Sequence, residues 1–448
     1  MAAVLFWVAV WLVAACAVDN DLLLASPVDV AASLAANFAS ASFWATVAAS
    51  GARIAATSVA CAVIGAVLGL LSVRFRLVER LCAPLVLVMK SAPVACVAVI
   101  LLVMLGPAGA VVVVVAFVSL PPFFVAATEA ARARPRDAER VLALLGVSPA
   151  RVFLVCTWPA CVPFFKAAAK TAVATSWRAG VTAELLGVPL GSIGSAVYVS
   201  KLTLDAAGLL AWTIVVMACG WACEKLAVGL VGLTAKSPRL ALRKGKGGEG
   251  EKRAEPASRR ASISLSDVDK SYGESAVLDG VSLRVVPGRR VCLMAPTGSG
   301  KTTLLRIALG LERPDAGSVE RPSRVGVVLQ TPTLVESLTA WENVLLAASR
   351  PTQAVRAQLE ALLPPGCADK PACDLSGGTR RLTEVARAVF SPGEAVVLDE
   401  PFAGLDEQTR LRACAFVLDH LNGRPLVVAT HEPQDARALD ACYTSLVS

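Results

Sequence analysis

One glycine-rich stretch carries residue types suited to binding phosphate: residues 295–303, Ala-Pro-Thr-Gly-Ser-Gly-Lys-Thr-Thr. The apolar run 290–294 before it is typical of a buried strand, and 304–309 after it is typical of a helix. A tight loop between a strand and a helix offers backbone N–H groups and the positive helix end to an anion. We therefore predict a phosphate-binding loop formed by Ala295, Pro296, Thr297, Gly298, Ser299, Gly300, Lys301, Thr302 and Thr303.

Within this loop, Lys301 is expected to reach the β- and γ-phosphates of a nucleotide, and the Thr302 hydroxyl to ligate Mg²⁺. The pattern is G-x-x-x-x-G-K-[ST], except that Ala295 stands at the first glycine position. If that position requires a positive φ, alanine costs about 1–2 kcal/mol there, and phosphate binding is weaker or locally adjusted. The alternative is a glycine-rich turn with a chance lysine, and partner motifs downstream argue against it.

Two carboxylates and a histidine follow buried strands further along the chain. Asp399 and Glu400 come directly after the apolar run 395–398, and His431 ends the run 427–430. Asp399 is placed to hold Mg²⁺ through water, and Glu400 to polarise an attacking water molecule. The alternative for the carboxylates is a solvated turn. The other histidine, His420, lies in a helical run and is expected to be structural.

Three further positions are candidates for nucleotide contacts. Gln330 ends the apolar run 325–329 and is placed to contact Mg²⁺ or water. Tyr272 is either an aromatic platform for adenine or a surface residue on a turn. Ser376 opens the helix 379–390, either as an ordinary cap or as part of an anion site, and capping does not explain the glycines that follow. The predicted anion site consists of Leu375, Ser376, Gly377 and Gly378.

Composition divides the chain into two unlike halves. Of 448 residues, 55% are hydrophobic and 17% charged, and the apolar excess lies in residues 1–235. We predict a transmembrane domain over 1–235, a basic flexible linker over 236–262 and a soluble α/β domain over 263–448. The net charge of +8 lies largely in the linker, which suits a juxtamembrane cytoplasmic segment better than a nucleic-acid site. The 13 cysteines form no C-x-x-C pair, so we predict no metal cluster and no disulfide framework.

The apolar half is predicted to be a bundle of about six helices, near residues 1–18, 53–73, 81–105, 108–125, 159–186 and 206–230. Residues 1–18 are alternatively a cleaved signal. Residues 26–50 are expected at the membrane interface, and 187–205 in a loop. The arginine-rich segments 74–80 and 128–151 are expected in the cytoplasm with the α/β domain.

Several charged residues fall inside predicted spans. Lys166, Lys170 and Arg178 share roughly one face of the fifth helix, and Glu184 lies near its outer end. A basic face suits an anionic substrate. The alternative, which we favour here, is that the lysines extend to the interface while Arg178 and Glu184 contribute to packing. Arg53 is expected at the interface.

The order of motifs in residues 263–431 resembles that of the ABC ATPases: aromatic residue, phosphate loop, glutamine, LSGG, Asp-Glu after a strand, and histidine. The resemblance implies ATP and Mg²⁺ as cofactors and a small helical subdomain at 331–374. It also implies that Leu375–Gly378 faces the γ-phosphate bound by an opposite protomer, that Asp406 in Gly-Leu-Asp senses the partner ATPase, and that His431 contacts the γ-phosphate and water. Thr379 replaces the glutamine usual in that family.

The membrane half resembles the permeases of nitrate/sulfonate/taurine-type ABC importers. The similarity lies in Ser-Pro at 26–27, Ser-Ala-Pro at 91–93, Gly146, Trp-Pro at 158–159 and Ala-Glu-Leu-Leu-Gly at 183–187. The resemblance implies that 128–151 contains a short helix that docks on the ATPase, whereas periodicity alone favours a solvated loop. At the family's Glu-Ala-Ala positions this chain has Arg140, Val141 and Leu142.

Together these features predict a permease fused to an ATPase, acting as half of an ATP-driven ABC importer in the inner (cytoplasmic) membrane. The family implies as partners a second copy or a related half, an extracytoplasmic solute-binding protein and a small solute such as an organic anion or a vitamin precursor, with no nucleic acid. The alternatives are an exporter or flippase half, and an ATP-switched membrane regulator that moves no solute.

Overall fold

The computed structural model describes residues 2–18, 20, 24–235, 261–296, 298–348 and 352–444. Most of the predicted linker, residues 236–260, and Thr297 of the predicted phosphate loop lie outside the described residues. The chain folds as two compact units. One unit consists of Met1–Arg134 and Ala160–Ala235, and the other of Pro135–Pro159 and Lys236–Ser448.

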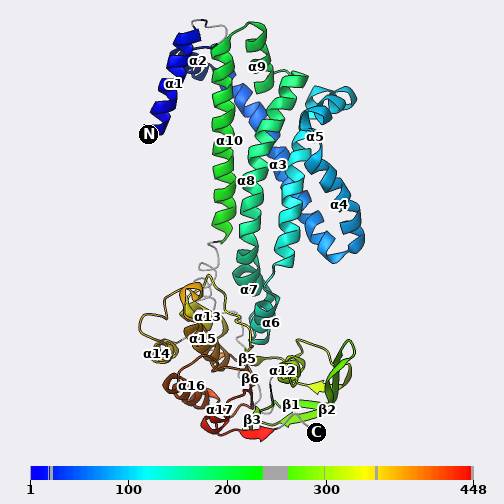
Figure 1. Ribbon diagram of the computed structural model, residues 1–448, viewed down its shortest axis with the longest axis vertical. Helices are drawn as coiled ribbons and strands as arrows, with labels where there is room; N and C mark the ends of the chain where they lie inside the picture. Colours follow the sequence, from blue (N-terminus) through cyan, green and yellow to red (C-terminus); the bar gives the residue numbers. More distant parts are fainter. Residues whose placement is uncertain are drawn as a thin grey trace. The chain divides into compact units, whose positions relative to one another are not determined.

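The first unit is built from helices alone among its described residues (Figure 1). Its helices are α1 (Ala2–Val18), α2 (Pro27–Phe38), α3 (Ala41–Arg74), α4 (Arg76–Ser91), α5 (Val94–Arg132), α8 (Trp158–Gly187), α9 (Ile193–Leu202) and α10 (Ala206–Ala235). The predicted helical bundle is therefore confirmed. Four helical stretches are long and apolar enough to cross a membrane: Ala41–Arg74, Val94–Arg132, Pro149–Gly187 and Ala206–Thr234. The apolar stretch in α1, Leu5–Val18, is shorter.

Several predicted helix bounds are wrong, and the backbone explains why. The span expected at 81–105 is interrupted, because Ala92 precedes Pro93 and takes an extended conformation with ψ 138°. The boundary expected between the spans 81–105 and 108–125 is confirmed, because Gly106 has a φ of 72°, which is not helical. The span expected to begin near residue 53 begins at Ala41, so the segment expected at the interface is α2 and the first turns of α3.

The loop expected at 187–205 contains a helix, α9, and its start is held by buried polar groups. Glu184 on α8 accepts hydrogen bonds from Ser50 Oγ at 2.9 Å and Arg53 Nη1 at 2.9 Å, both on α3, and from the backbone N–H of Gly194 at 3.3 Å. Ser192 and Ser195 form a capping box. Glu184 is fully buried, so its pairing with Arg53 offsets the cost of removing a charge from water.

The expected contribution of an Arg178–Glu184 contact to packing is therefore wrong. Residues six apart on an α-helix point about 240° apart, so these two side chains do not share a face. Arg178 is exposed, and its Nε donates to the carbonyl of Ala174 at 3.2 Å. Arg53 pairs with this buried carboxylate, and its position at the membrane interface stays a prediction.

Helices α3 and α5 approach each other closely at two glycines of α3. A Cβ atom on Gly65 would lie 2.9 Å from the carbonyl oxygen of Leu120, and one on Gly69 would lie 2.5 Å from that of Phe124. Ser72 and Thr128 hydrogen-bond beside this contact. Small residues of this kind let two membrane helices pack with their backbones close together.

The second unit has the α/β fold predicted for the C-terminal half. A parallel sheet has the strand order β5-β6-β7-β3-β8, and an antiparallel sheet has the order β2-β1-β4. The strands are β1 (Ile263–Tyr272), β2 (Ser275–Val285), β3 (Arg290–Leu293), β4 (Ala316–Glu320), β5 (Val325–Val328), β6 (Ala395–Asp399), β7 (Leu426–Ala429) and β8 (Cys442–Thr444). Strands β5, β6 and β7 are buried throughout, as expected where both faces of a parallel sheet are covered.

Alternate residues of these strands enter two different cores. Val327 and Val397 pack with Leu305 and other residues of α12 (Lys301–Ala308), whereas Val328 and Leu398 pack against the helices of the opposite face. Those helices are α13 (Ala340–Ala347), α14 (Gln353–Leu362), α15 (Gly377–Phe390), α16 (Glu407–His420) and α17 (Pro433–Ala438), with a 3-10 turn η2 (Ala372–Asp374) before α15. The candidate nucleotide-site residues therefore lie after the ends of the parallel strands: Lys301 after β3, Gln330 after β5, Glu400 after β6 and His431 after β7.

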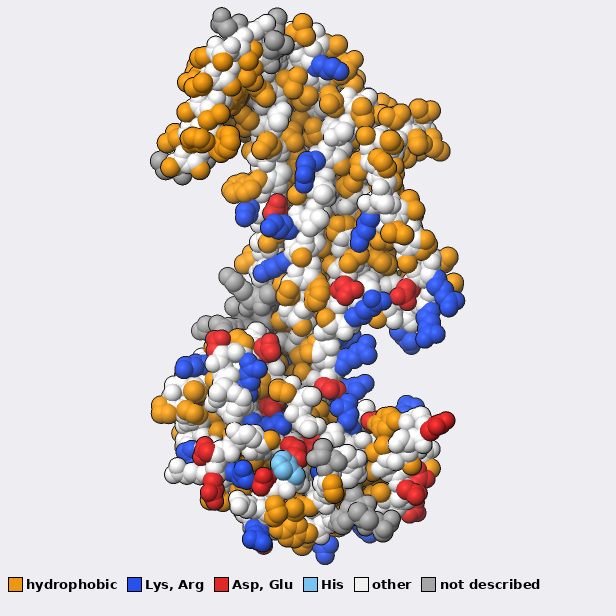
Figure 2. Space-filling model, in the orientation of Figure 1, with side chains coloured by type: hydrophobic (Ala, Val, Ile, Leu, Met, Phe, Trp, Pro, Cys, Tyr) orange, Lys and Arg blue, Asp and Glu red, His pale blue; other side chains and the backbone are white. Residues whose placement is uncertain are grey.

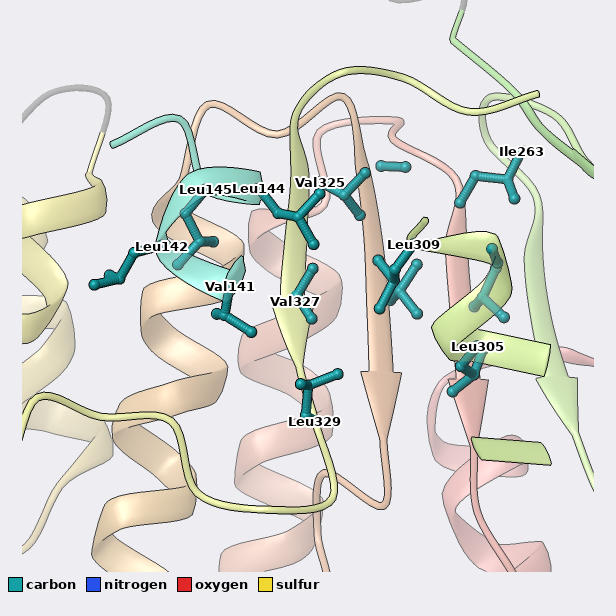
Figure 3. Close-up of a cluster of buried hydrophobic side chains, with 14 of the residues drawn as sticks. Val141, Leu142, Leu144, Leu145, Ile263, Leu305, Leu309, Val325, Val327 and Leu329 are labelled. Carbon is teal, nitrogen blue, oxygen red and sulfur yellow. The ribbon is translucent and has the colours of Figure 1, made fainter. Parts of the chain in front are cut away.

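The segment at 135–159 belongs to this second unit, and it decides between the two interpretations of 128–151. It forms α6 (Arg136–Leu144), α7 (Pro149–Val152) and a π-helical turn η1 (Phe153–Thr157). Val141 and Leu142 of α6 are fully buried in the same core as Val325 and Val327 of β5. Figure 3 shows Val141 and Leu144 of α6 towards these strand residues and Leu142 on the other side of the helix. The segment is a docked helix, and the solvated-loop interpretation is wrong.

Gly69→Ala should destabilise the helical unit by roughly 1–3 kcal/mol, because the added methyl group forces α3 and α5 apart. Thermal unfolding of the detergent-purified protein measures the effect. Gly229→Ala on α10 is the matched control, since a Cβ there meets no atom within 4 Å. An equal melting temperature for both variants would contradict the close α3–α5 contact.

Candidate active site

The predicted phosphate loop connects β3 to α12, as its sequence suggested. Gly298 and Gly300 have φ values of 89° and 87°, which favour glycine. A Cβ at Gly300 would also lie 2.9 Å from the carbonyl oxygen of Val277. The described non-glycine residues with positive φ are Val188, Leu204, Asp267, Glu400, Asn422 and Asp440. Ala295 is not one of them, so the conditional backbone cost expected for alanine does not arise.

Lys301 begins α12, directly after this loop. Its side chain is buried, and its Nζ donates to the carbonyl oxygens of Ala295 and, at 3.0 Å, Pro296. The ammonium group is therefore held across the mouth of the loop by neutral acceptors. A phosphate oxygen is a stronger acceptor for an ammonium group than a carbonyl, so an anion in the loop can compete for this donor.

Asp399 has a buried carboxylate whose oxygens are free to accept hydrogen bonds or to bind a cation. It ends β6 with 2% exposure, and neither of its oxygens has a hydrogen-bond partner among the described residues. Burial raises the pKa of Asp399, and the neighbouring Thr302 hydroxyl opposes that rise. An unpaired carboxylate beside a threonine hydroxyl is a donor set that fits Mg²⁺, which usually takes few protein ligands and keeps several waters.

The structure brings Glu400 and His431 together. Strands β6 and β7 are parallel neighbours, with Asp399 opposite Ala429, so the residues after their ends meet at one edge. His431 Nδ1 lies 3.0 and 2.9 Å from the two carboxylate oxygens of Glu400. Glu400 also has a φ of 47°, which is rare for a residue with a side chain and is found preferentially at functional sites.

Tyr272 is the last residue of β1, and Gln330 comes shortly after the end of β5. The Tyr272 side chain is exposed, and its hydroxyl donates to Glu312. This hydrogen bond raises the pKa of Tyr272. The hydroxyl of Thr303 in the phosphate loop lowers that pKa by a smaller amount. Gln330 follows β5 and is exposed, which leaves its side chain accessible to a ligand.

The signature residues open α15 as predicted. Ser376 caps the helix by accepting from the backbone N–H of Thr379 at 3.2 Å, and the Thr379 hydroxyl lies 2.8 Å from Ser376 Oγ. Thr379 thus supports the cap in place of the glutamine. Leu375 is buried, whereas a Cβ on Gly377 would face open space. Within the described parts of the unit, no hydrogen bond or ion pair joins Leu375–Gly378 to the phosphate loop.

Asp406 caps α16 by accepting from the backbone N–H of Thr409 at 2.9 Å. This hydrogen bond lowers the pKa of Asp406, so the carboxylate stays charged at the surface.

Sequence reasoning missed a buried charged cluster that holds the segment after β5. Arg381 on α15 donates to the carbonyl oxygens of Leu329 at 2.6 Å and Gln330 at 3.1 Å. Glu384 accepts from the backbone N–H of Thr333 at 2.5 Å, and Arg387 donates to the carbonyl of Thr333 at 3.0 Å. The signal in the sequence was three charged residues at helical spacing on the buried face of α15. The cluster ties the helix that carries the signature to the position of Gln330.

The Glu400 contact should make His431 retain its proton to higher pH. Glu400 raises the pKa of His431, so the charged pair is complete below the ordinary histidine pKa and is lost as pH rises through the raised value. Histidine-selective ¹³C labelling and NMR of the full chain measure this, since there are two histidines. Glu400→Gln should lower the pKa of His431, with the His420 signal as internal reference. An unchanged titration of His431 would contradict the contact.

Comparisons with known proteins relate both parts of the chain to transporter families. Residues 278–403 match the family described as ABC transporter, and residues 62–226 match the family described as binding-protein-dependent transport system inner membrane component. The chain is 42% identical over 179 residues to the aliphatic sulfonates import ATP-binding protein SsuB 1 of Nocardia farcinica, covering 39% of this chain and 73% of that protein. It is 40% identical over 182 residues to SsuB of Granulibacter bethesdensis, covering 40% of this chain and 76% of that protein.

An exporter component is also similar. The Nod factor export ATP-binding protein I of Paraburkholderia xenovorans is 36% identical over 200 residues, covering 40% of this chain and 66% of that protein. All three similarities concern ATP-binding subunits and extend over about two fifths of this chain. The permease match, over residues 62–226, includes most of the helical unit, whose long apolar helices make this a membrane protein. The chain belongs to the ABC transporter family, and it joins a membrane permease to an ATPase that couples ATP hydrolysis to transport.

Proposed function

We propose that this chain is half of an ATP-driven importer, which works with a second copy or a related half and with an extracytoplasmic binding protein. The observation that carries the proposal is the permease class matched over residues 62–226, which is named for its dependence on a binding protein. The similarity of the ATPase to sulfonate import subunits supports the same direction. The proposed cargo is a small organic anion or vitamin precursor.

The proposed organisation keeps the predicted domains, 1–235, 236–262 and 263–448, in the inner membrane with the ATPase in the cytoplasm. The arginine-rich ends of the membrane helices support that orientation. Helix α6 lies within 1–235 in the sequence but packs in the ATPase unit. It is therefore the proposed mechanical connection between the nucleotide site and the membrane helices.

We assign each candidate site residue a task at the bound nucleotide. Lys301 and the loop N–H groups hold the β- and γ-phosphates, and the exposed ring of Tyr272 stacks on adenine. Thr302, Asp399 and Gln330 hold Mg²⁺ directly or through water, and the ion, when bound, neutralises charge on the phosphates. Glu400 orients and polarises the attacking water, and His431 holds Glu400 in position and contacts the γ-phosphate.

The second half of each site is proposed to come from the partner. Gly377 opens α15 towards free space, so the helix N-terminus is available to a phosphate bound elsewhere. Leu375–Gly378 of one protomer would then close on the nucleotide held by the other, with Asp406 near the junction. Closure on ATP and reopening after hydrolysis supply two states that α6 can transmit.

The mechanical connection is argued from the contacts of α6. Val141 and Leu142 are fully buried in the core that also contains β5, the strand that leads to Gln330, with Val141 on the side of α6 nearer to β5 (Figure 3). Burial of each side chain contributes about 1.5–3 kcal/mol to the docking of α6. Arg306 of α12 lies 3.5 Å from Asp137 of α6, so the helix also touches the element that follows the phosphate loop. A conformational change in the phosphate loop or at Gln330 would therefore reach α6 by two contacts, the Arg306–Asp137 pair and the shared core with β5.

An exporter is the second candidate, because the ATPase is also similar to a Nod factor export subunit. Transport assays with the purified protein in vesicles distinguish an importer from an exporter. We expect ATP-dependent accumulation of ethanesulfonate, nitrate or a vitamin precursor only when a cognate binding protein is present. Accumulation without any binding protein, or movement out of the ATPase-side compartment, would favour the exporter. ATP binding without hydrolysis in the complete complex would favour a regulator.

Glu400→Gln should lower the rate of ATP hydrolysis by about 10²–10⁴-fold, because the amide cannot polarise water as a carboxylate does. The KM for ATP should change little, since phosphate binding is assigned to other residues. Phosphate release by the reconstituted protein measures both constants. Glu407→Gln, on an exposed carboxylate in the first turn of α16, is the control. Unaltered hydrolysis in Glu400→Gln would remove Glu400 from its proposed task.

Val141→Asp should separate hydrolysis from uptake, because a charge in the α6 core contact weakens docking while the nucleotide residues stay intact. The ratio of solute taken up to ATP hydrolysed is expected to fall. Arg140→Ala changes an exposed residue of the same helix and should leave that ratio as in the wild type. Normal coupling in Val141→Asp would show that α6 does not transmit the motion.

A further inference from the structure

Helix α4 presents a row of exposed apolar side chains, which we call the α4 stripe. Its members have exposed fractions of 55–68%: Leu77, Leu81, Leu85, Leu87 and Val88. The buried residue of this helix is Val86, and at 100° per residue it points to the side opposite Leu77. An exposed apolar surface of this kind on a membrane protein is typical of a contact with lipid or with another protein.

The length and charge of α4 differ from those of the spanning helices. Of the described helices, four stretches are long and apolar enough to cross a membrane, and α4 is not among them. Its 16 residues extend for about 24 Å, which is less than the roughly 30 Å of the hydrocarbon core. Three of its four charged residues lie in its first five positions. An exposed apolar side with charge at one end is typical of a helix at the boundary between headgroups and acyl chains.

Three exposed arginines gather at the corner where α3 ends and α4 begins. Arg74 is the last residue of α3, Arg76 is the first of α4, and Arg80 follows one turn later. The single residue between the helices, Phe75, is extended, with φ −125° and ψ 110°. The Arg74 guanidinium lies 5.6 Å from the centre of the Phe75 ring. Within the described ranges, none of the three arginines forms an ion pair.

The carboxylate nearest in sequence does not neutralise this corner. Glu79 is the only acidic residue of α4, and it accepts from Arg132, at the end of α5, at 3.0 Å. The corner therefore keeps three positive charges. Figure 2 shows Lys and Arg side chains, in blue, at the lower end of α4, with hydrophobic surface in orange above them (Figure 1).

The corner and the α4 stripe together suit one class of molecule. A guanidinium group binds a phosphate through two parallel hydrogen bonds. Arg76 and Arg80 are four residues apart, so they are neighbours on one side of the helix. From Arg76 to Val88 the helix advances about 18 Å, which gives an acyl chain an apolar surface to follow. A phosphate joined to acyl chains is complementary to both parts.

We propose that the corner between α3 and α4 binds an anionic phospholipid. Its headgroup phosphate lies among Arg74, Arg76 and Arg80, and its acyl chains lie along the α4 stripe. A zwitterionic headgroup also carries a phosphate, but its own cation cancels much of the attraction, so the arginines select a lipid with net negative charge. The inference depends only on the membrane location of the helical unit, and not on the direction of transport or on the solute.

Photo-crosslinking of the full-length protein in vesicles tests this site without requiring uptake or hydrolysis. The probes are phosphatidylglycerol and phosphatidylcholine with the same diazirine on one acyl chain, each as a minor component of phosphatidylcholine vesicles. After illumination, mass spectrometry of peptides measures the adducts on residues 77–88. The peptide of α3 that exposes Val59 and Val63 is the internal reference for ordinary contact with lipid.

We expect phosphatidylglycerol to label residues 77–88 about fivefold more than phosphatidylcholine does, and both probes to label the α3 reference equally. Arg76→Gln with Arg80→Gln should lower that preference several-fold. Arg76→Lys with Arg80→Lys should retain most of it, because the charge remains. Arg284→Gln with Arg289→Gln removes as many charges from exposed positions of the second unit and is the matched control. Equal labelling of the α3 reference in all variants shows that the fold is kept.

Equal labelling of residues 77–88 by both probes, or a preference unaltered by the two glutamines, would overturn the anionic site. If neither probe labels this segment while the α3 reference is labelled, protein covers the α4 stripe and lipid is not its occupant. Suppression of the labelling by soluble glycerol phosphate would assign the arginines to a free phosphate and would also overturn the proposal. A protein that labels as expected but shows no binding-protein-dependent uptake would count against the proposed importer alone.

Discussion

The docking of α6 onto β5 is the contact on which the rest of the second unit depends. α6 belongs by sequence to the permease, yet its apolar side closes the same core as the strand that leads to Gln330. Gly146 ends the helix with a φ of 85°, and a Cβ there would lie 3.2 Å from Arg324, directly before β5. The core of the ATPase is therefore incomplete without a segment from the other half of the sequence. The contact between α6 and β5 therefore completes the folded core and is also suited to transmitting a movement of the ATPase to α6.

Strand β5 is held from both sides at the point where it meets the nucleotide site. On one side are the apolar residues of α6, and on the other Arg381, Glu384 and Arg387 bind the backbone of residues 329–333. Buried charges are costly unless they are paired, and such clusters are retained where a defined geometry is needed. Here the geometry links the start of the signature helix to Gln330 and to β5, the strand that packs with α6.

The helical unit uses its charges in two different ways. Glu184 and Arg53 are paired and join α3, α8 and the start of α9, which is a packing arrangement. Arg178 lies on the same helix as Glu184, six residues away, but faces outwards on a different side. Helical geometry separates the two residues, because different sides of one helix meet different surroundings. A single helix thus contributes both to the closed packing of the bundle and to an exposed surface that carries a charge.

The sequence by itself determined the elements whose signals are local. The phosphate loop, the buried strands, the signature cap and the apolar helices depend on glycine positions, periodicity and capping within a few residues. The tertiary structure decided the matters that depend on distant partners. The docking of α6, the pairing of Glu184 with Arg53 instead of Arg178, the contact of Glu400 with His431 and the cluster around Arg381 all join residues far apart in the chain. No local pattern encodes such partners, because the free energy of a buried contact depends on what the fold places opposite it.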